Sequence, residues 1–386
     1  MKGKHSASYN DESYVPKAFR NQQNNSNYRK RDERVEEKMA NKKTKKKRKG
    51  LKIFGIIVLI LIILLGAIVG AGYWFISDKF SKMQQVDINE EELNVSAQAE
   101  ENLSEYRNIA IFGVDSRSNN LEQGNRSDCI IIASINNNTK EIRLISVYRD
   151  TYVQIEGHGL DKITHAYSYG SAPLAIKTLN TNLDLNIKEF VTVNFDSVAE
   201  AVDQLGGVTI NIESQEELKY LNSYIDETAS VTGKSNAKVS GTGRQNLNGV
   251  QAVAYSRIRY TAGGDYKRTE RMRTVIEAMV EKIKTKSIGE INSFIDFMMP
   301  KVYTNITAGD IISLLPSIAS FKIGDSLGWP YETKGITLDR WYGVPVTLES
   351  NVTRLHQELF GEADYTPTED VKTISNQIIN RTGYRN

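Results

Sequence analysis

The feature that most constrains this chain is an uninterrupted apolar run near its N-terminus. Residues Ile53 to Ile76 contain no charged side chain over 24 positions, and about 20 apolar residues suffice to cross the hydrocarbon core of a bilayer as a helix. The run ends in Tyr73, Trp74 and Phe75, and such aromatic rings favour the headgroup level. We therefore expect a single transmembrane helix over residues 53–76.

The charges on the two sides of this run differ in sign and predict its orientation. Residues 1–52 carry 17 Lys and Arg against 6 Asp and Glu, a net charge of +11, whereas residues 77–386 carry 32 against 41, a net charge of −9. Cationic flanks stay on the cytoplasmic side. We therefore expect a single-pass protein of the cell membrane, with its N-terminus in the cytoplasm and its body outside the cell.

Other interpretations of the N-terminal region agree less well with the sequence. A buried core helix rarely has 24 uncharged residues in a row, and a cleaved signal peptide has a shorter apolar run and a small-x-small cleavage site. The basic run Lys42 to Lys49 could contact nucleic acid, but beside a membrane span it is better explained by the membrane surface and topology. No nucleic-acid partner is expected.

Composition divides the chain into four parts. Residues 1–52 are too polar to repay the entropy of ordering and form a disordered cytoplasmic tail, and residues 53–76 form the span. Residues 77–105 suit a short extracellular stalk, or alternatively a helical segment that packs on the domain. Residues 106–386 alternate between strand and helix patterns, which predicts one layered α/β domain.

The predicted elements of this domain follow from hydrophobic periodicity. Central strands are expected at Ile109–Val114, Ile130–Ile135 and Ile142–Val147, and further strands at Phe190–Phe195 and Val208–Ile212. Helices are expected at His165–Leu185, Asn248–Tyr255 and Thr269–Lys284, with a last helix that ends before Gly383. Asp196 or Ser197 could cap the helix after Phe195, and Thr366 could cap the last one.

Cysteine and histidine content limits the chemistry that the domain can perform. Cys129 is the only cysteine, so no intramolecular disulfide can form. Four histidines and one cysteine offer no spacing typical of a zinc site. The domain must be stabilised by its packed core.

Two acidic residues stand at the ends of predicted strands. Asp115 follows the first strand and Asp128 precedes the second. Ligands gather at strand ends in α/β sheets, and two carboxylates that converge there can hold a divalent cation. Each aspartate alone is more typical of a turn at a strand end. Together with the basic residues around it, the pair indicates a metal site, with either residue, or less readily Asp150, as a general base.

Basic residues accompany this pair in tight clusters. Arg257 and Arg259 share one side of the chain if the segment is extended, and Arg268 and Arg271 share one face of a helix that follows the glycine turn Gly263-Gly264. Planar guanidinium groups match phosphate oxygens in pairs of hydrogen bonds. In a domain of net charge −9, such a concentration of arginine predicts an anionic ligand.

An ordered set of segments resembles the LytR-CpsA-Psr family of cell-wall glycopolymer ligases. The segments are Ile109-Ala-Ile-Phe-Gly-Val-Asp115-Ser-Arg117, Arg126-Ser-Asp128, Ser146-Val-Tyr-Arg149-Asp150-Thr151, Asp161-Lys162-Ile-Thr-His165-Ala-Tyr167, Tyr255-Ser-Arg257-Ile-Arg259-Tyr260 and Gly264-Asp265-Tyr-Lys-Arg268-Thr-Glu-Arg271. The resemblance extends from about Ile109 to Lys284. It implies an α-β-α sandwich around a mixed central sheet that binds polyprenyl pyrophosphate, with the lipid tail in an apolar pocket.

By position, the resemblance assigns roles to ten residues. Asp115 and Asp128 are expected to coordinate Mg²⁺, with Mn²⁺ as an alternative, and with Arg149 they are the expected catalytic residues. The expected pyrophosphate-binding residues are Arg117, Arg149, Lys162, Arg257, Arg259, Asp265, Arg268 and Arg271. Tyr148 departs from the family, which usually has proline there.

The implied activity is a phosphotransferase in cell-wall assembly. A hydroxyl of peptidoglycan attacks the phosphorus nearest the glycan, and polyprenyl phosphate leaves. The glycan could be a teichoic acid or a capsular polysaccharide, and loops within Glu213 to Leu247 are the expected source of selectivity. The alternatives are a non-catalytic module that binds lipid-linked polymer and a transcriptional attenuator of envelope genes. There is no Gly-x-Ser-x-Gly sequence and no P-loop.

Overall fold

The computed structural model describes residues 84–116, 120–122, 124–232, 234–235, 237–283, 285–306 and 322–385. The predicted transmembrane segment, residues 53–76, and the predicted site residue Arg117 lie outside these ranges. None of the helices within them is long and apolar enough to cross a membrane.

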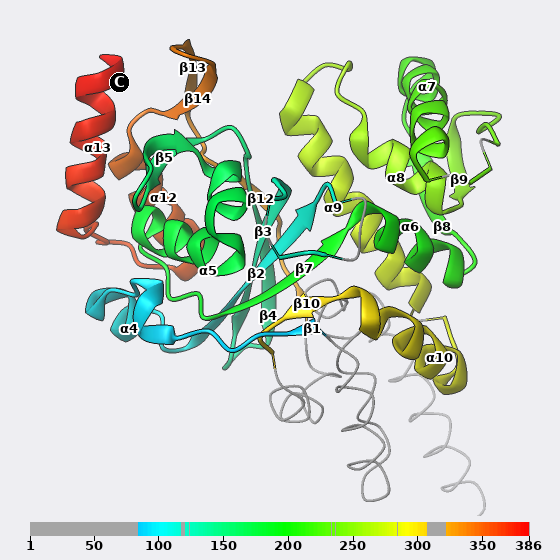
Figure 1. The fold of residues 1–386 in the computed structure, drawn as a ribbon, viewed down its shortest axis with the longest axis horizontal. Coiled ribbons are helices and arrows are strands. Elements are labelled where there is room, and N and C mark those ends of the chain that lie inside the picture. The colour runs from blue at the N-terminus through cyan, green and yellow to red at the C-terminus, as the bar shows by residue number, and fades with distance from the viewer. Residues whose placement is uncertain are drawn as a thin grey trace, which may run out of the picture. The chain divides into compact units, whose positions relative to one another are not determined.

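A mixed sheet of eight strands forms the centre of the domain (Figure 1). The strand order is β1-β10-β7-β2-β3-β4-β11, and β12 also pairs with β4. The strands are β1 (Gln84–Gln85), β2 (Tyr106–Val114), β3 (Ser127–Asn136), β4 (Glu141–Val147), β7 (Glu189–Asn194), β10 (Tyr303–Thr304), β11 (Lys322–Ile323) and β12 (Leu327–Trp329). Because β3 is antiparallel to β2 and β4 while β7 is parallel to β2, the predicted mixed central sheet is confirmed.

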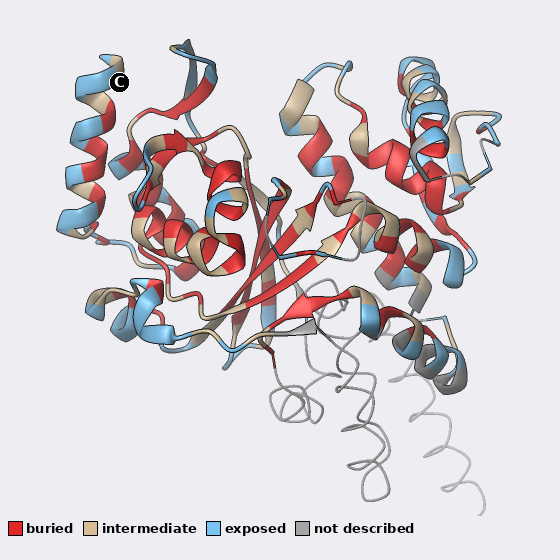
Figure 2. Cartoon of the chain, in the orientation of Figure 1, coloured by how far each residue is buried: buried red, intermediate tan, exposed pale blue. Residues whose placement is uncertain are grey.

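Side chains on successive strand residues enter two separate cores, one on each face of the sheet. In β2, Ile109 and Ile111 belong to one core, and Ala110, Phe112 and Val114 belong to the other, as the twofold periodicity of a strand requires. Figure 2 shows buried residues along the strands and on the inward faces of the helices. Because both faces of these strands are buried, their sequences are nearly continuous runs of apolar, β-branched residues. This composition is what predicts them as strands.

Helices cover both faces of the sheet and complete the α-β-α sandwich. On the face of Ile109 and Ile111 lie α6 (Phe195–Gln204), α7 (Gln215–Thr232), α8 (Gly249–Arg257), α9 (Gly264–Ile283) and α10 (Ile288–Met298). On the opposite face lie α4 (Ala97–Asn102), α5 (Ile163–Leu183), α12 (Leu348–Phe360) and α13 (Glu369–Thr382). The short elements are η2 (Glu90–Leu93), η3 (Met299–Lys301) and three two-stranded ribbons, β5 (Tyr152–Ile155) with β6 (Gly159–Lys162), β8 (Val208–Ile212) with β9 (Gly243–Leu247), and β13 (Thr333–Thr337) with β14 (Trp341–Pro345).

Several local predictions differ from the structure. The strand at Val208–Ile212 forms, but it pairs with β9 outside the central sheet. The cap of α6 is Asn194, whose side chain accepts a hydrogen bond from Ser197 N at 2.7 Å, and the cap of α13 is Thr368. In each case the observed cap stands two or three residues from the predicted one, because several neighbouring residues are of types that are similarly favoured at a cap.

The segment predicted as a stalk or a packed helix packs on the domain over its described part. Strand β1 pairs with β10. Leu93 and Leu103 are fully buried in the same core as the apolar residues of α5. The buried side chain of Asn180 donates to the Leu93 carbonyl at 3.0 Å. Residues 84–105 are therefore an integral part of the domain, because their apolar side chains are spaced to reach its core.

The start of α8 is fixed by a close backbone approach to α6. Gly249 N donates to the Asp203 carboxylate at 2.7 Å, and a Cβ at Gly249 would lie 2.0 Å from the Ala199 carbonyl oxygen. This contact positions the helix whose last residue is Arg257.

We expect Gly249→Ala to lower the free energy of unfolding by about 1–3 kcal/mol, because a backbone carbonyl cannot move aside as a flexible side chain can. Chemical denaturation measures this loss. Gly241→Ala is the matched control, since its Cβ meets only the Gln245 amide at 3.8 Å. Equal stability of the two variants would contradict the proposed close packing of α8 on α6.

Candidate active site

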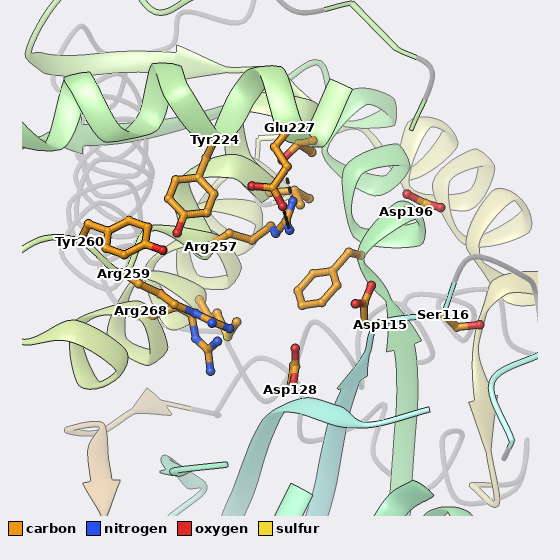
Figure 3. A pocket seen from close by; sticks show the side chains of 14 residues that line it. Asp115, Ser116, Asp128, Asp196, Tyr224, Glu227, Arg257, Arg259, Tyr260 and Arg268 are labelled. Atoms are coloured by element: carbon orange, nitrogen blue, oxygen red, sulfur yellow. Dashed lines mark hydrogen bonds and ion pairs between the residues drawn. The ribbon is translucent and has the colours of Figure 1, made fainter. Parts of the chain in front are cut away.

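A cavity of about 370 Å³ opens where β2 ends and β3 begins. Figure 3 shows that acidic and basic side chains face each other across it. Five of the ten residues predicted from the sequence line it, namely Asp115, Asp128, Arg257, Arg259 and Arg268. Four others, Arg149, Lys162, Asp265 and Arg271, lie outside its lining, and Arg117 lies outside the described residues.

The two aspartates reach the cavity from neighbouring strands. Val114 is paired with Ser127 at the end of the β2–β3 ladder, and Asp128 stands in the register shift between this pair and the pair Gly113 and Cys129. Asp115 directly follows Val114, so the two aspartates emerge at the same edge. Asp196, in the first turn of α6, also lines the cavity. Its pKa is raised by burial and by the nearby charges of Glu200 and Asp115, against the effect of Lys234.

The carboxylates of Asp115 and Asp128 line the cavity and could hold a divalent cation. Within the described ranges, no group of three or more His, Cys, Asp or Glu residues is arranged to hold a metal. Mg²⁺ typically takes one or two carboxylates and completes its octahedral shell with water and substrate phosphates. Asp115 and Asp128 could supply two such carboxylates.

Behind the cavity, acids and bases form one continuous network of ion pairs. Arg149 Nη1 lies 2.7 Å from Asp128 Oδ1, and its Nε lies 3.4 Å from Asp150 Oδ2. Lys162 Nζ lies 2.7 Å from the other oxygen of Asp150. The position of Asp128 is therefore fixed through Arg149, which does not itself face the cavity.

Asp265 connects this network to the arginines on the other side of the cavity. Its carboxylate lies 2.9 Å from Arg268 Nη2, 3.6 Å from Arg259 Nε and 3.8 Å from Arg149 Nε. Asp265 therefore joins Arg149, Arg259 and Arg268 in one network and holds their guanidinium groups in place.

Arg257 and Arg259 lie on either side of a buried residue. Arg257 ends α8, Ile258 continues in an extended conformation (φ −60°, ψ 125°), and Ile258 is fully buried. The two arginines therefore face the cavity together, as expected for an extended segment. Arg257 Nη2 contacts Glu227 at 2.7 Å, and its Nη1 donates to Thr228 Oγ1 at 3.1 Å.

Arg271 occupies a structural position instead. Its side chain and that of Glu217 are each only 3% exposed, and they are joined at 2.8 Å. Its remaining nitrogens donate to the Ile258 carbonyl and to Thr261 Oγ1. Arg271 thus supports the segment that carries Arg257 and Arg259, a role that spacing on a helix could not distinguish from ligand binding.

Two arginines of the site, like Arg143 elsewhere in the described part of the chain, have a buried donor without a hydrogen-bond acceptor. In the described part of the chain, the Nε atoms of Arg149 and Arg268 are buried and have no hydrogen-bond partner. Burial lowers the pKa of Arg268 to about 10, an effect that Asp265 partly offsets and that Arg149 and Arg259 reinforce. For Arg149, burial acts to lower the pKa, but Asp128, Asp150 and Asp265 outweigh it and the pKa is raised.

Both groups are therefore positively charged at neutral pH. Leaving a buried charged donor unpaired costs free energy. Arg268, which also lines the cavity, is a ready donor for an anionic ligand.

Tyr148, the departure from the family pattern, is accommodated by β12. Its backbone N donates to the Trp329 carbonyl at 2.9 Å, which proline could not do. Its ring packs edge-on against Tyr266 at 4.3 Å. Tyr148 therefore adds one hydrogen bond to the sheet. The next residue, Arg149, still makes its contacts with Asp128 and Asp150.

The sequence did not indicate the contribution of α7. Tyr224, Glu227 and Thr228 of this helix line the cavity, within the segment Glu213 to Leu247 that was expected to provide selectivity loops. Most of that segment is helix and strand. The i, i+4 spacing of Tyr220 and Tyr224 places both rings on one helix face, and this was the available signal.

Comparisons with known proteins identify relatives of this chain. The model of the LytR_cpsA_psr family matches residues 72–327. The teichoic acid transferase TagU of Enterococcus faecalis is 30% identical over 321 residues, covering 81% of this chain and 97% of the relative. TagT of Bacillus subtilis, also named as a teichoic acid transferase, is 30% identical and covers 78% of this chain and 92% of the relative.

A solved structure supports the same assignment. The structure described as TagT bound to LIIa-WTA superimposes with a TM-score of 0.51 at 25% identity, covering 73% of this chain and 92% of that chain. Nearly the whole length of these relatives is matched, through the sheet and the helices that line the cavity. The chain belongs to the LytR-CpsA-Psr family.

Proposed function

We propose that this protein is a phosphotransferase that moves a glycopolymer from polyprenyl pyrophosphate to peptidoglycan. The observation that carries the proposal is the cavity in which Arg257, Arg259 and the partly unpaired Arg268 face the carboxylates of Asp115 and Asp128. An array of arginines suits the oxygens of a diphosphate. The relatives named as polyisoprenyl-teichoic acid–peptidoglycan transferases support this choice of donor and acceptor.

The chemistry needs positioning and neutralisation of charge more than a protein nucleophile. The acceptor hydroxyl oxygen forms a bond to the phosphorus nearest the glycan, and the bond from that phosphorus to the bridging oxygen breaks. The proton of the hydroxyl passes to a carboxylate at the cavity wall, and polyprenyl phosphate leaves. Arg257, Arg259 and Arg268 stabilise the charge that develops on the phosphoryl oxygens.

Asp115 and Asp128 would hold a divalent cation, with Mg²⁺ preferred for its oxygen ligands. When bound, such an ion neutralises negative charge on the diphosphate and on the leaving group. Arg149 keeps Asp128 in place through the contact at 2.7 Å. The protein supplies the remaining positive charge from its arginines.

The charge distribution of the N-terminal region supports a location at the cell membrane, with the catalytic domain outside the cell. The net charge of +11 before the apolar run supports an N-terminus in the cytoplasm. A domain attached in this way lies beside the membrane, where a polyprenyl-linked donor is anchored.

A transfer assay with the full-length protein tests the proposal. Purified protein is incubated with a polyprenyl-pyrophosphate glycan and uncrosslinked peptidoglycan, and glycan on peptidoglycan is the expected product. Binding of the donor without any product would instead support a carrier module.

Removal of divalent cations by a chelator is expected to lower transfer by at least about a hundredfold, with recovery on adding Mg²⁺. Asp115→Asn and Asp128→Asn should abolish the stabilisation that Mg²⁺ gives to the donor-bound protein, measured as a thermal shift. Asp370→Asn, an exposed position in the first turn of α13, is the control. Full transfer in the chelated enzyme would rule out a metal requirement.

A further inference from the structure

An exposed tyrosine stands beside the arginines of the cavity. Tyr260 lines the cavity yet is 68% exposed, the largest exposed fraction among the large hydrophobic residues that the structure describes as exposed. It follows Arg259 directly in the chain. Removing a large aromatic ring from water is favourable. A ligand that covers the Tyr260 ring would therefore gain binding free energy.

Two tyrosines of α7 fix the position of this ring. Tyr220 and Tyr224 are four residues apart on the helix, and the centroid of Tyr260 lies 5.9 Å from the first and 6.3 Å from the second. The interplanar angle with Tyr224 is 28°. The guanidinium carbon of Arg257 lies 6.0 Å from the Tyr224 ring. Tyr260 therefore belongs to an aromatic cluster with Tyr220 and Tyr224 beside Arg257.

The lining of the cavity differs between its interior and its rim. Val253 and Met272 are almost fully buried and offer an apolar wall, which suits a hydrocarbon. At the rim, Tyr224 and Tyr260 stand beside Glu227 and Arg257. A mixture of aromatic faces with charged groups suits a ligand that is apolar on its ring face and polar at its edge.

A pyranose ring has this chemistry. The C–H bonds on one face of a hexose are electropositive and pack against the negative face of an aromatic ring, while its hydroxyl groups project at the edge toward donors and acceptors such as Arg257 and Glu227. In Figure 3 the tyrosines lie on the far side of Arg257 and Arg259 from Asp115 and Asp128. A group attached to a diphosphate held by these arginines is therefore within reach of the tyrosines.

We infer that Tyr260, supported by Tyr220 and Tyr224, forms a subsite that stacks on the first sugar of the glycan carried by the diphosphate. This inference rests on the proposed function, because it assumes that the arginines hold the diphosphate. In this arrangement α7 and the segment after α8 recognise the sugar and not the lipid.

The test compares two ligands that differ only in the sugar. Binding of polyprenyl pyrophosphate, with and without one attached hexose, is measured by titration calorimetry on the full-length protein in detergent. We expect the wild type to bind the glycosylated carrier about tenfold more tightly, the value of one aromatic contact. Tyr260→Ala should lose this preference and leave the affinity for the bare carrier unchanged.

Two further variants serve as controls. One distinguishes the contribution of the Tyr260 ring from that of its hydroxyl group, and the other tests whether removing any partly exposed tyrosine changes binding. Tyr260→Phe should retain the preference, because the ring face makes the contact. Tyr384→Ala, a half-buried tyrosine near the C-terminus whose ring lies 5.7 Å from Lys334 Nζ, should match the wild type.

Two results would overturn the inference alone. One is equal affinity of the wild type for both carriers, and the other is an equal loss for both in Tyr260→Ala, which would place the ring against the lipid or the detergent. If the wild type binds neither carrier, the proposed function fails and the subsite fails with it.

Discussion

Replacing Arg257 by alanine is expected to lower the rate of glycan transfer by at least about a hundredfold while the domain remains folded. Its guanidinium group faces the cavity and is joined to Glu227, which is itself largely exposed. The substitution therefore removes charge from the site, and the carboxylate that loses its partner is exposed to water. Arg259→Ala should behave in the same way, because Arg259 is also partly exposed and lines the same cavity.

Steady-state transfer rates and thermal unfolding of the same preparations measure this effect. Arg257→Lys keeps the positive charge but loses the planar pair of donors, so an intermediate rate is expected. Arg354→Ala is the control, since that exposed arginine of α12 pairs with Glu358 at 2.8 Å outside the cavity. Unchanged turnover in both Arg257→Ala and Arg259→Ala would refute the assignment of the site.

The second large effect is on stability. Arg271→Ala is expected to lower the free energy of unfolding by about 3–5 kcal/mol, because it leaves the buried carboxylate of Glu217 without its partner. It also frees the Ile258 carbonyl that Arg271 holds, so transfer should fall in parallel with folding. Denaturant unfolding monitored by far-UV circular dichroism gives the free energy directly.

A paired replacement shows whether the loss comes from the unpaired charge. Glu217→Leu combined with Arg271→Met removes both charges and fills similar volume, so the double variant should be far more stable than Arg271→Ala alone. If Arg271→Ala unfolds within about 1 kcal/mol of the wild type, the buried ion pair has no structural importance.

The sheet could be predicted from the sequence because its central strands are buried on both faces. Ile109–Val114, Ile130–Ile135 and Ile142–Val147 are runs of β-branched residues, and each lies within a strand of the structure. The pairing partner of each strand was harder to predict from the sequence. Val208–Ile212 has the same composition but joins only β9, since strand composition does not specify which edge a strand meets.

The site could be predicted as a set of residues but not as an arrangement. Asp115, Asp128, Arg257, Arg259 and Arg268 do line one cavity. Arg271, with the same residue type and a helical spacing from Arg268, is buried against Glu217, a partner 54 positions away. Contacts between distant segments of the chain decide whether an arginine binds a ligand or a carboxylate, and spacing along one segment does not report them.

The contribution of α7 was hidden for a related reason. Its residues lie far in sequence from the strand ends that indicated the site, and nothing within the helix shows that it crosses the cavity. Only its packing on α8 through residues such as Leu221 and Ile225, in the core shared with Val250 and Ala254, brings Tyr224 and Glu227 to the rim. Tyrosine spacing alone is more typical of a half-buried helix face.

The central claim is that phosphorus travels with the glycan, and isotopic labelling tests this most directly. Two donors are prepared with ³²P in either the phosphate next to the glycan or the phosphate next to the polyprenyl chain, and each is incubated with the protein and uncrosslinked peptidoglycan. The account predicts that only the first label enters peptidoglycan and that the second leaves as polyprenyl phosphate. Glycan on peptidoglycan without either label, with pyrophosphate retained on the lipid, would contradict phosphotransfer and indicate cleavage at the sugar carbon.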